Sequence, residues 1–449
     1  MKITAFFHRL IYFVLGAEAV IIMFYMMMGL SSCNSKQAGD PAFFEMKPVQ
    51  ENTSTVLWNP EVYDFETGNQ FCMSHFKNMG NGIAKLAAGA CTSWRNGQYH
   101  GRNLDWYQAN YGCLIVQMPK GGKVKHASVG TVNASTIVTQ DFIQQGVLTD
   151  EMRKVLPAAA TDGINDAGVA VNINIVPHQP GDYFIDEEGD LSCACVVRYV
   201  LDNAGSVTEA LDLLKARKVS QSIVKLAGDE AHYMISNADT TVVVEFPQGE
   251  MQVVFFTKNE QGWYSPNGNP AIMANFYDYA AEQYEVGSDE FYNYHPTAMG
   301  VERWQTVKAQ YDNAKNDVAS NLTIAKSVWY FKNLMTEKQQ WYTENAVPEG
   351  GYGKDAQGWY FMTEGQRVDV SDANQAMQGY WKANMETYWK NYELQYGQQS
   401  DPHVKGNMFW ETSHSVVYDL QNKKGYLYPF ENFYSQDGNP VVIEIVEKI

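Results

Sequence analysis

The sequence is poor in positive charge. It contains 33 Lys and Arg residues against 51 Asp and Glu residues, so its formal net charge is −18. A chain with this balance offers no basic patch to the phosphates of a nucleic acid, and we therefore expect no nucleic-acid partner. The sequence also lacks the Cys-x-x-Cys and His-Glu-x-x-His spacings of common metal sites. We accordingly expect neither a metal nor a cofactor.

Internal repeats are absent as well, and the only biased tract is a short polar linker, NSKQAGDP. What remains is a chain of 449 residues, of which 45% are apolar. This length suffices for one large core or for two domains.

The longest apolar run lies at the N-terminus. Lys2 and Arg9 precede it, and it ends in the sequence LSSC, whose cysteine is Cys33. A basic start, an apolar stretch, small residues and then a cysteine are typical of a bacterial lipoprotein signal. We predict a signal peptide over residues 1–32, a lipid on Cys33, and an exported, membrane-anchored protein in the periplasm or at the cell surface of a bacterium. The alternative is an uncleaved membrane helix, since the run is long enough to span a bilayer.

A tight hairpin is predicted around Asn96-Gly97, because both residues tolerate the positive φ of a type I′ turn. Pairing outward from a two-residue turn places Cys91 opposite Arg102, with Cβ atoms roughly 4.5–5.5 Å apart. A guanidinium there favours the thiolate and lowers the thiol pKa from about 8.5. Asp105 follows, placed to hold Arg102 or a nearby amine. The alternative is an ordinary hairpin with a buried cysteine and an Arg–Asp pair.

The remaining cysteines carry no metal-site spacing. Cys193 and Cys195 are too close in sequence for a relaxed mutual disulfide. We interpret them, together with Cys72 and Cys113, as buried thiols, and the sequence alone assigns no disulfide among them.

The rest of the chain has mainly strand patterns, over residues 99–139, 161–177 and 232–257 and in a hairpin near the C-terminus. Ser206 and Glu209 form a capping box that opens an amphipathic helix. Runs of strands with helices between them, and few βαβ alternations, indicate an α+β protein with antiparallel sheets.

Residues 335–400 differ in character, because they are dense in Trp, Tyr, Gln and Asn. We predict an aromatic-rich insertion here, with a helix that begins after Ser371-Asp372. It either carries aromatic contacts over a site or packs as an outer helix on the main body.

The hairpin sequence CTSW…YHGRNLDW resembles the opening of the choloylglycine hydrolase family, the linear-amide hydrolases that include bile salt hydrolases and penicillin V acylases. It is also similar to the start of the mature chain of N-acylethanolamine acid amidase and acid ceramidase. Further segments resemble the family in the same order: DGINDAGVAVNINIVP, CACVVRYVLDNAGSVTEALDLL, HYMIS…TVVVEF, MANFYDY, GVERW and HSVVYDLQNKKGYLYPFEN. The resemblance covers most of residues 91–330 and residues 405–435.

This resemblance implies an N-terminal nucleophile hydrolase, a four-layer αββα sandwich, over residues 91–449. Cleavage between Ala90 and Cys91 would free an α-amine whose pKa of about 7.7–8.0 suits a general base. The thiolate would then attack an amide carbonyl, and water would hydrolyse the resulting thioester. Residues 33–90 would form a linker and a pro-segment, which either stays bound or is released after the cut.

The resemblance also assigns roles to individual residues. Cys91 is the nucleophile and, through its amine, the base; Arg102 stabilises the thiolate, and Asp105 holds the amine. Asn275 resembles the asparagine that helps to stabilise the oxyanion, and Arg303 resembles the final active-site arginine of the family. Loss of one oxyanion donor typically slows an enzyme about 10²–10³-fold.

One position departs from the family pattern. Ile175 falls where bile salt hydrolases carry an asparagine and penicillin V acylases often carry a tyrosine. Either Asn174 replaces that oxyanion donor after a small shift, or the donor is absent. This departure weakens a specific assignment to bile salts.

The sequence therefore predicts a hydrolase of linear amide bonds that acts on small N-acyl conjugates. Conjugated bile acids, N-acyl amino acids, N-acyl amines and phenoxyacetyl amides all fit this class. The alternative function is a non-catalytic exported lipoprotein that binds aromatic or glycan ligands. A homo-oligomer is compatible with the sequence.

Overall fold

The structure is a computed structural model. It describes residues 55–57, 60–78, 90–106, 113–133, 154–177, 189–221, 229–295, 298, 300–328, 352–355, 357–363, 366–371, 411–429 and 440–446. The predicted signal peptide, the predicted lipidation site Cys33 and the predicted helix after Ser371 lie outside these residues.

The strands of the described part are β1 Thr55–Leu57, β2 Ala90–Asn96, β3 Tyr99–Trp106, β4 Cys113–Met118, β5 Ser128–Asn133, β6 Asp162–Asn165, β7 Ala170–Pro177, β8 Leu191–Ser192, β9 Val219–Ser220, β10 Asp229–Ser236, β11 Thr241–Glu245, β12 Gln252–Lys258, β13 Trp263–Tyr264, β14 Ile272–Met273, β15 Tyr352–Asp355, β16 Gly358–Thr363, β17 Gln366–Val370, β18 Glu411–Asp419, β19 Lys424–Pro429 and β20 Val441–Glu444. The helices are α2 Phe65–Asn78, α5 Val196–Asn203, α6 Val207–Lys215, α8 Asp278–Ala281, α9 Asp289–Tyr294, α10 Val301–Tyr311 and α11 Val318–Ser327, with short 3₁₀ turns η6 Leu156–Ala159, η7 Cys193–Cys195 and η8 Pro247–Gly249.

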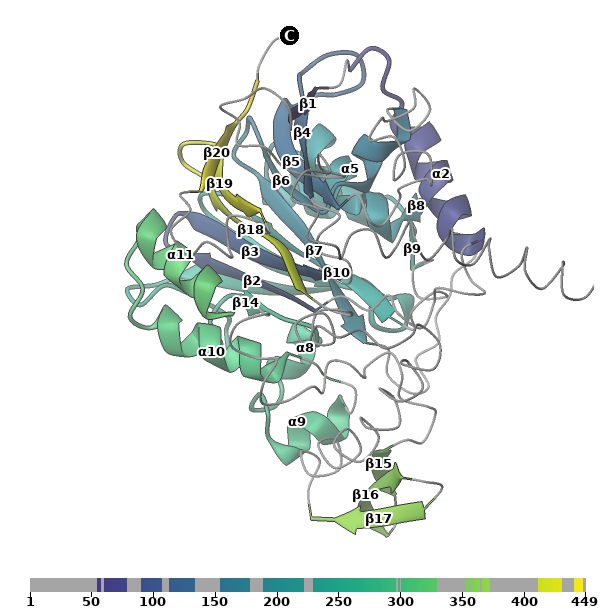
Figure 1. Ribbon diagram of the computed structural model, residues 1–449, viewed down its shortest axis with the longest axis vertical. Coiled ribbons are helices and arrows are strands. Elements are labelled where there is room, and N and C mark those ends of the chain that lie inside the picture. Colours follow the sequence, from purple (N-terminus) through teal and green to yellow (C-terminus); the bar gives the residue numbers. More distant parts are fainter. Residues whose placement is uncertain are drawn as a thin grey trace, which may run out of the picture.

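Two large sheets form the centre of the molecule (Figure 1). The first has nine strands in the order β1-β4-β5-β6-β7-β10-β11-β12-β13, and the second has six in the order β14-β2-β3-β18-β19-β20. Apart from the parallel β1–β4 pair, the neighbouring strands of both sheets run antiparallel. The two sheets pack face to face, with β2 and β3 against β7.

Helices cover the outer face of each sheet. On the nine-stranded sheet, α5 packs against β6 and β7 and buries Val200 and Leu201 in the core. On the six-stranded sheet, α10 packs against β2 and β14, while α11 packs against β3 and β18, and they bury Trp304 and Ile324. The order of layers is therefore helix, sheet, sheet, helix, and the predicted α+β class with an αββα sandwich is confirmed.

The β2–β3 hairpin forms, but the predicted register is wrong. The turn residues are Gly97 and Gln98, so Asn96 pairs with Tyr99 and Cys91 lies opposite Leu104. Gly97 has a φ of 56°, which is the positive value that the first central residue of a type II′ turn needs. The side chain of Asn316 accepts a hydrogen bond from the Gln98 amide and occupies the space that a Cβ on residue 97 would need. A residue from a distant loop thus selects the turn.

Other local predictions are confirmed. The Ser206 hydroxyl accepts a hydrogen bond from the Glu209 amide at the start of α6, as the capping box predicts. Strands β10, β11 and β12 form a continuous antiparallel meander, and β18 with β19 forms the C-terminal hairpin. The segment 161–177 contains two strands, β6 and β7, where the sequence predicts one. Cys72, Cys193 and Cys195 are buried free thiols.

The predicted pro-segment contributes to the fold. Strand β1 adds to the edge of the nine-stranded sheet beside β4. Helix α2 packs against β8, η6 and η7, and it buries Cys72 in the core. The side chain of Asn69 donates to the carbonyl of Asp190 and accepts from the amide of Ser192, both at 2.8 Å.

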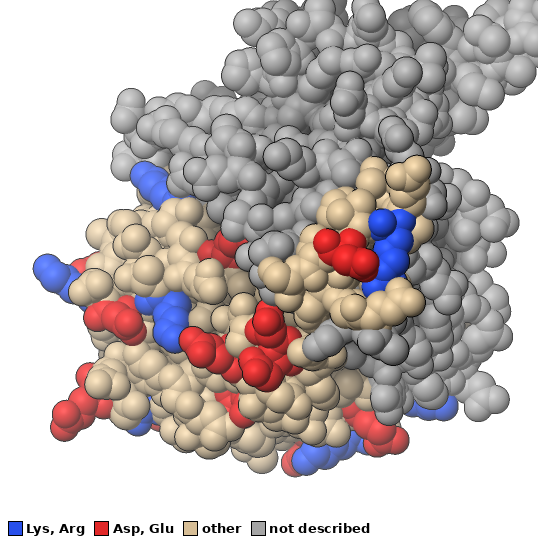
Figure 2. Space-filling model, turned by 90° about the horizontal axis from the view of Figure 1, so that it is seen from below, with Lys and Arg blue, Asp and Glu red and all other residues tan. Residues whose placement is uncertain are grey.

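Within the predicted insertion, β15, β16 and β17 form a small antiparallel sheet apart from the main sheets (Figure 1). The sequence predicts a helix nearby and does not predict these strands. No helix of the described part combines the length and the apolar character needed to cross a bilayer. On the face drawn in Figure 2, acidic and basic side chains are interspersed over the described surface.

The contact between β2 and the outer helices gives a stability prediction. Trp94 is fully buried, and its indole Nε1 donates to Oδ1 of Asn321 at 3.0 Å. We expect Trp94→Ala to lower the free energy of unfolding by about 3–5 kcal/mol, because a large cavity opens under α11. Urea denaturation measures this loss. As a control, Phe255→Ala, at a side chain that is 48% exposed, should change the same quantity by less than about 1 kcal/mol.

Candidate active site

The alternation of side chains along β2 and β3 divides the candidate site into two halves. Cys91 and Arg102 point to the same face of the hairpin, toward β7 of the other sheet. Asp105 and Thr92 point to the opposite face, toward Arg303 of α10. The backbone of Cys91 lies where these two halves meet.

On the inter-sheet face, Arg102 reaches the thiol despite the shifted register. Its Nη2 lies 3.8 Å from Sγ of Cys91. The two residues are diagonal neighbours in the ladder, a relation in which long side chains still meet. The predicted proximity of sulfur and guanidinium is therefore present, although the predicted direct pairing is not.

Arg102 is held rigidly by acceptors on the other sheet. Nη1 donates to Oδ2 of Asp162 at 2.6 Å and to the carbonyl of Thr161 at 2.8 Å, and Nη2 donates to the carbonyl of Ile173 at 2.9 Å. Both side chains of the Arg102–Asp162 pair have no exposed surface. A buried guanidinium needs such a counter-charge, since an unpaired one would cost several kcal/mol.

Asp162 is itself the centre of a hydrogen-bond network. Its Oδ2 lies 2.9 Å from Nε2 of His414, and its Oδ1 accepts from the hydroxyl of Tyr418 at 2.5 Å. Burial alone would raise the pKa of Asp162, but His414, Arg102 and Tyr418 together hold it well below its ordinary value. Asp162 therefore stays ionised and keeps Arg102 in place. The sequence does not single out these three network residues, because their roles appear only when β6 and β18 meet.

On the face of the hairpin toward α10, Arg303 donates hydrogen bonds to the backbone of Cys91 and to two side chains near it. Its Nη1 donates to the carbonyl of Cys91 at 2.5 Å and to the hydroxyl of Thr92 at 2.8 Å. Its Nη2 donates to Oδ1 of Asn275 at 2.6 Å. Arg303 also lies 3.8 Å from Oδ2 of Asp105. The predicted arginine thus contacts the candidate nucleophile through the main chain.

Asn275 meets the backbone nitrogen of Cys91. Its Oδ1 accepts a hydrogen bond from that nitrogen at 2.8 Å, and its Nδ2 donates to the carbonyl of Ile175 at 2.5 Å. The structure therefore brings together Cys91, Arg102, Asp105, Asn275 and Arg303, five residues that the sequence analysis selects.

Asn174 is not part of this group. Its Nδ2 donates to the carbonyls of Met273 and Ala274, and its Oδ1 accepts from Ser93 and Asn172. These bonds link β7 to β2 and to β14 rather than to Cys91. In this uncut chain the side-chain amide of Asn174 therefore connects the two sheets.

The predicted lowering of the Cys91 pKa is wrong for the uncut chain. Cys91 is only 1% exposed, and burial raises the pKa of its thiol, while the charge of Arg102 opposes that shift without overcoming it. Because a thiolate is the reactive form, the buried Cys91 of the uncut chain is predominantly a thiol at neutral pH.

The carboxyl group of Asp105 is only partly hydrogen-bonded within the described part of the chain. Its Oδ1 accepts from the hydroxyl of Thr412 at 2.6 Å, whereas Oδ2 has no hydrogen-bond donor among the described residues. Burial raises the pKa of Asp105 to about 7, with Arg303 opposing the shift. In the β2–β3 ladder Asp105 lies directly opposite Ala90, the residue before Cys91. Asp105 therefore lies on the strand position next to the peptide bond that the sequence analysis expects to be cut.

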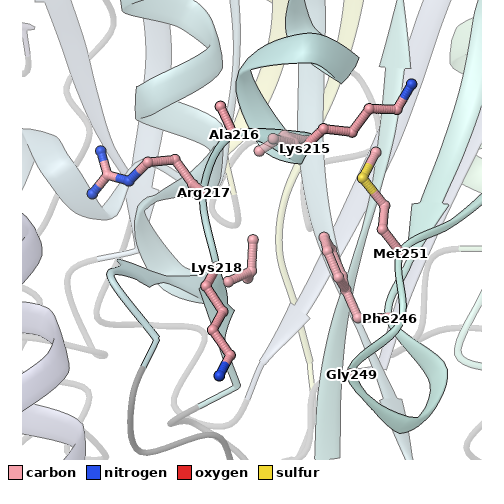
Figure 3. Close-up of a pocket in the computed structure, with 9 residues that line it drawn as sticks. Lys215, Ala216, Arg217, Lys218, Phe246, Gly249 and Met251 are labelled. Carbon is pink, nitrogen blue, oxygen red and sulfur yellow. The ribbon is translucent and has the colours of Figure 1, made fainter.

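A separate pocket of about 400 Å³ lies between the end of α6 and the β11–β12 connection (Figure 3). Leu214, Phe246 and Met251 give it an apolar lining, and Lys215 and Lys218 lie at its edge. No residue of the Cys91 group lines this pocket.

Comparison with known families identifies the class of this catalytic region. Residues 91–284 match the model of the linear amide C–N hydrolases, choloylglycine hydrolase family. The match begins at Cys91 and ends within the chain segment that follows Asn275. The family predicted from the hairpin motif is thereby confirmed for this region, and its class is that of linear amide hydrolases.

Solved structures are similar to this chain at low identity. Penicillin V acylase from Agrobacterium tumefaciens is 13% identical, over 77% of this chain and 75% of that chain, with a TM-score of 0.34. Two variants of conjugated bile acid hydrolase from Clostridium perfringens are 13% and 12% identical, with TM-scores of 0.35 and 0.34. They cover 80% and 76% of this chain and 93% and 90% of their own chains. No curated protein matches this chain.

The raised pKa of Asp105 gives a testable pH dependence in the uncut chain. A folded-state pKa of about 7, against an ordinary value of 3.8, means that between these values the folded chain holds a proton that the unfolded chain has lost. Stability should therefore fall as pH rises from about 4 to about 7, by an amount of the order of 1 kcal/mol per pH unit.

This is best measured in the Cys91→Ala background, where the expected cut does not occur. Asp105→Asn in that background should remove the contribution of Asp105 and leave that of other buried carboxyls such as Asp202, so the difference in unfolding free energy between the two variants should change steadily across this window. A difference that is constant from pH 4 to pH 7 would show that Asp105 keeps an ordinary pKa.

Proposed function

We propose that this chain is a cysteine-dependent amidase whose nucleophile, Cys91, becomes active when the Ala90–Cys91 peptide bond is cut by the protein itself. One observation carries the proposal: the thiol of Cys91 lies beside the guanidinium of Arg102 while its backbone nitrogen is held by Asn275. The family match starts at this same cysteine.

The cut begins with attack of Sγ of Cys91 on the carbonyl carbon of Ala90. The carbon–nitrogen bond breaks, the nitrogen of Cys91 leaves as an amine, and the pro-segment is left as a thioester that water hydrolyses. Gly89 and Ala90 carry little or no side chain to obstruct this attack. Asp105 lies opposite Ala90 and, once the cut is made, its Oδ2, which accepts no hydrogen bond from the described residues, pairs with the new amine.

Turnover then uses the same atoms. The α-amine, with an ordinary pKa of about 7.7–8.0, takes the proton of the thiol, and Arg102 stabilises the thiolate. The thiolate attacks the amide carbonyl of the substrate, the amine product leaves with a proton, and water hydrolyses the thioester. Nδ2 of Asn275 supplies a donor for the oxyanion by exchanging its bond to the carbonyl of Ile175. Arg303 keeps Asn275 and the carbonyl of Cys91 in position.

The substrates we propose are small N-acyl conjugates, with conjugated bile acids as the first class to test. The family model that matches residues 91–284 is that of linear amide C–N hydrolases, choloylglycine hydrolase family, which favours an acyl group joined through an amide. The position of Ile175 gives no reason to prefer bile acids over N-acyl amines. We further propose that the mature protein is an exported lipoprotein, anchored through Cys33.

The alternative function, a non-catalytic lipoprotein that binds aromatic or glycan ligands, gains no support from the site. It would leave the convergence of Arg102, Asn275 and Arg303 on Cys91 without a purpose.

The decisive test of the proposal is intact mass with N-terminal sequencing, followed by amide hydrolysis assays. We expect a chain that begins at Cys91 and hydrolyses at least one of glycine- or taurine-conjugated bile acids, N-acyl amines or penicillin V. Cys91→Ala should remain uncut and lose all activity. Cys193→Ala, at another buried thiol, is the matched control and should be cut and active. An active enzyme with an unbroken peptide before Cys91 would contradict the proposal.

The packing of the pro-segment gives a second prediction. Because β1 extends the nine-stranded sheet and α2 is tied to the β8 region through Asn69, residues 55–78 should stay bound after the cut. Gel filtration of the cleaved protein should elute both pieces together, and denaturing chromatography should separate them. Asn69→Ala should loosen α2 and increase pro-segment loss in urea, whereas a freely dissociating wild-type pro-segment would refute its structural role.

A further inference from the structure

Behind Asn275 lies a buried group of ionisable side chains that the proposed reaction does not use. His232 on β10, Glu245 on β11 and Asp278 at the start of α8 are at most 4% exposed. Their potential ligand atoms all lie within 4.8 Å of one another. The segment that carries Asn275, between β14 and α8, packs directly on this group.

The first contact fixes one proton of His232. Its Nε2 lies 2.9 Å from the carbonyl oxygen of Ala274, the residue that precedes Asn275. A carbonyl oxygen only accepts hydrogen bonds, so Nε2 of His232 must carry the hydrogen.

The second contact requires a further proton. Nδ1 of the same ring lies 3.1 Å from Oε1 of Glu245. If Nε2 carries the only hydrogen, Nδ1 is an acceptor and cannot bind an ionised carboxylate. One additional proton must therefore be shared between Nδ1 of His232 and Oε1 of Glu245, either as an imidazolium–carboxylate pair or as a neutral imidazole that accepts from a protonated carboxyl.

Glu245 also holds the far end of the same segment. Its Oε1 accepts from the amide of Asp278 at 2.7 Å, and its Oε2 accepts from the amide of Tyr279 at 3.0 Å. The His232–Glu245 pair therefore clamps the backbone on both sides of Asn275, at residue 274 and at residues 278–279. Between these two clamps, Oδ1 of Asn275 meets the nitrogen of Cys91 at 2.8 Å.

A metal ion is the other occupant that these side chains would suit. However, both nitrogens of His232 and both oxygens of Glu245 already bind partners within the group or its backbone. Burial and the nearby Glu245 raise the pKa of Asp278 well above its ordinary value, and a metal ligand must give up its proton, so this shift disfavours metal binding by Asp278. Other ionisable groups nearby among the described residues include Glu282, whose charge also raises the pKa of Asp278, Glu230, which accepts from the hydroxyl of Tyr277, and His295, whose pKa burial lowers to about 3.

We propose that His232 and Glu245 are positioning residues of the amidase, which hold Asn275 at the reacting atoms through a shared proton on the Nδ1–Oε1 line. The inference rests on the proposed function and adds two residues to it, neither of which touches substrate. Misplacement of a catalytic group by about 1 Å can slow a reaction on the order of 10²-fold.

The test compares kcat and KM for paired variants, each normalised to the fraction of chain that begins at Cys91. We expect His232→Ala to lower kcat on the order of 10²-fold with KM unchanged, because Asn275 acts on the reacting atoms. His232→Gln keeps an Nε2 donor for Ala274 and should recover a large part of this loss. Glu245→Gln donates to Nδ1 through its amide nitrogen but gives up the acceptor that Oε1 offers to the Asp278 amide, so it should lose less activity than Glu245→Ala, which should match His232→Ala. The matched control is His126→Ala, a histidine that pairs with Asp166 outside this group and should leave kcat unchanged.

Three outcomes would overturn the inference. One is a wild-type kcat in folded His232→Ala, and another is equal loss in the alanine and glutamine variants at position 232. The third is one equivalent of metal in the purified protein that disappears in His232→Ala, measured by elemental analysis. A wild-type chain that is cut at Cys91 but hydrolyses no amide would instead count against the proposed function.

Discussion

The buried pair of Arg102 and Asp162 is the interaction on which the site depends. Both side chains lie between the two sheets without exposed surface, and each would be costly there alone. Arg102 belongs to the six-stranded sheet and Asp162 to the nine-stranded sheet, so the pair fixes how the sheets lie against each other. The position of the guanidinium beside Cys91 follows from this contact and from the carbonyls of Thr161 and Ile173, rather than from the hairpin alone.

The sequence predicts the parts of this arrangement that local patterns encode. The capping box at Ser206, the meander from β10 to β12 and the C-terminal hairpin depend on short-range propensities and form as expected. The hairpin register differs from the predicted one, because the side chain of Asn316 binds the Gly97-Gln98 turn. Asn316 is more than two hundred residues away in the sequence. Local sequence patterns do not identify Asp162 for the same reason, because its partners lie on β3 and β18, which are distant from it in the sequence.

The residues of the candidate site also fall into those that a local motif reveals and those that it does not. Cys91, Arg102 and Asp105 lie within 15 residues of one another, so a motif reveals them. Asn275 and Arg303 are found through family resemblance, and both contact the backbone of Cys91, while their catalytic roles stay predictions. His232 and Glu245 leave no local signal, since a histidine and a glutamate on apolar strands are usually satisfied core residues. Their importance emerges only from the bonds that they make to the backbone around Asn275.

The pKa shifts give the proposed cut a physical consequence beyond the release of a base. In the uncut chain, burial raises the pKa of the Cys91 thiol and raises the pKa of Asp105 to about 7, so the site as a whole carries less negative charge than its residues suggest. A new α-amine beside Asp105 would add a second cation besides Arg303, which lies 3.8 Å from Oδ2, and would favour the ionised form of the carboxyl. The amine then exchanges its proton with the thiol under the field of Arg102. In the proposed scheme, the uncut and the cut chain thus differ at this site by one additional charged group.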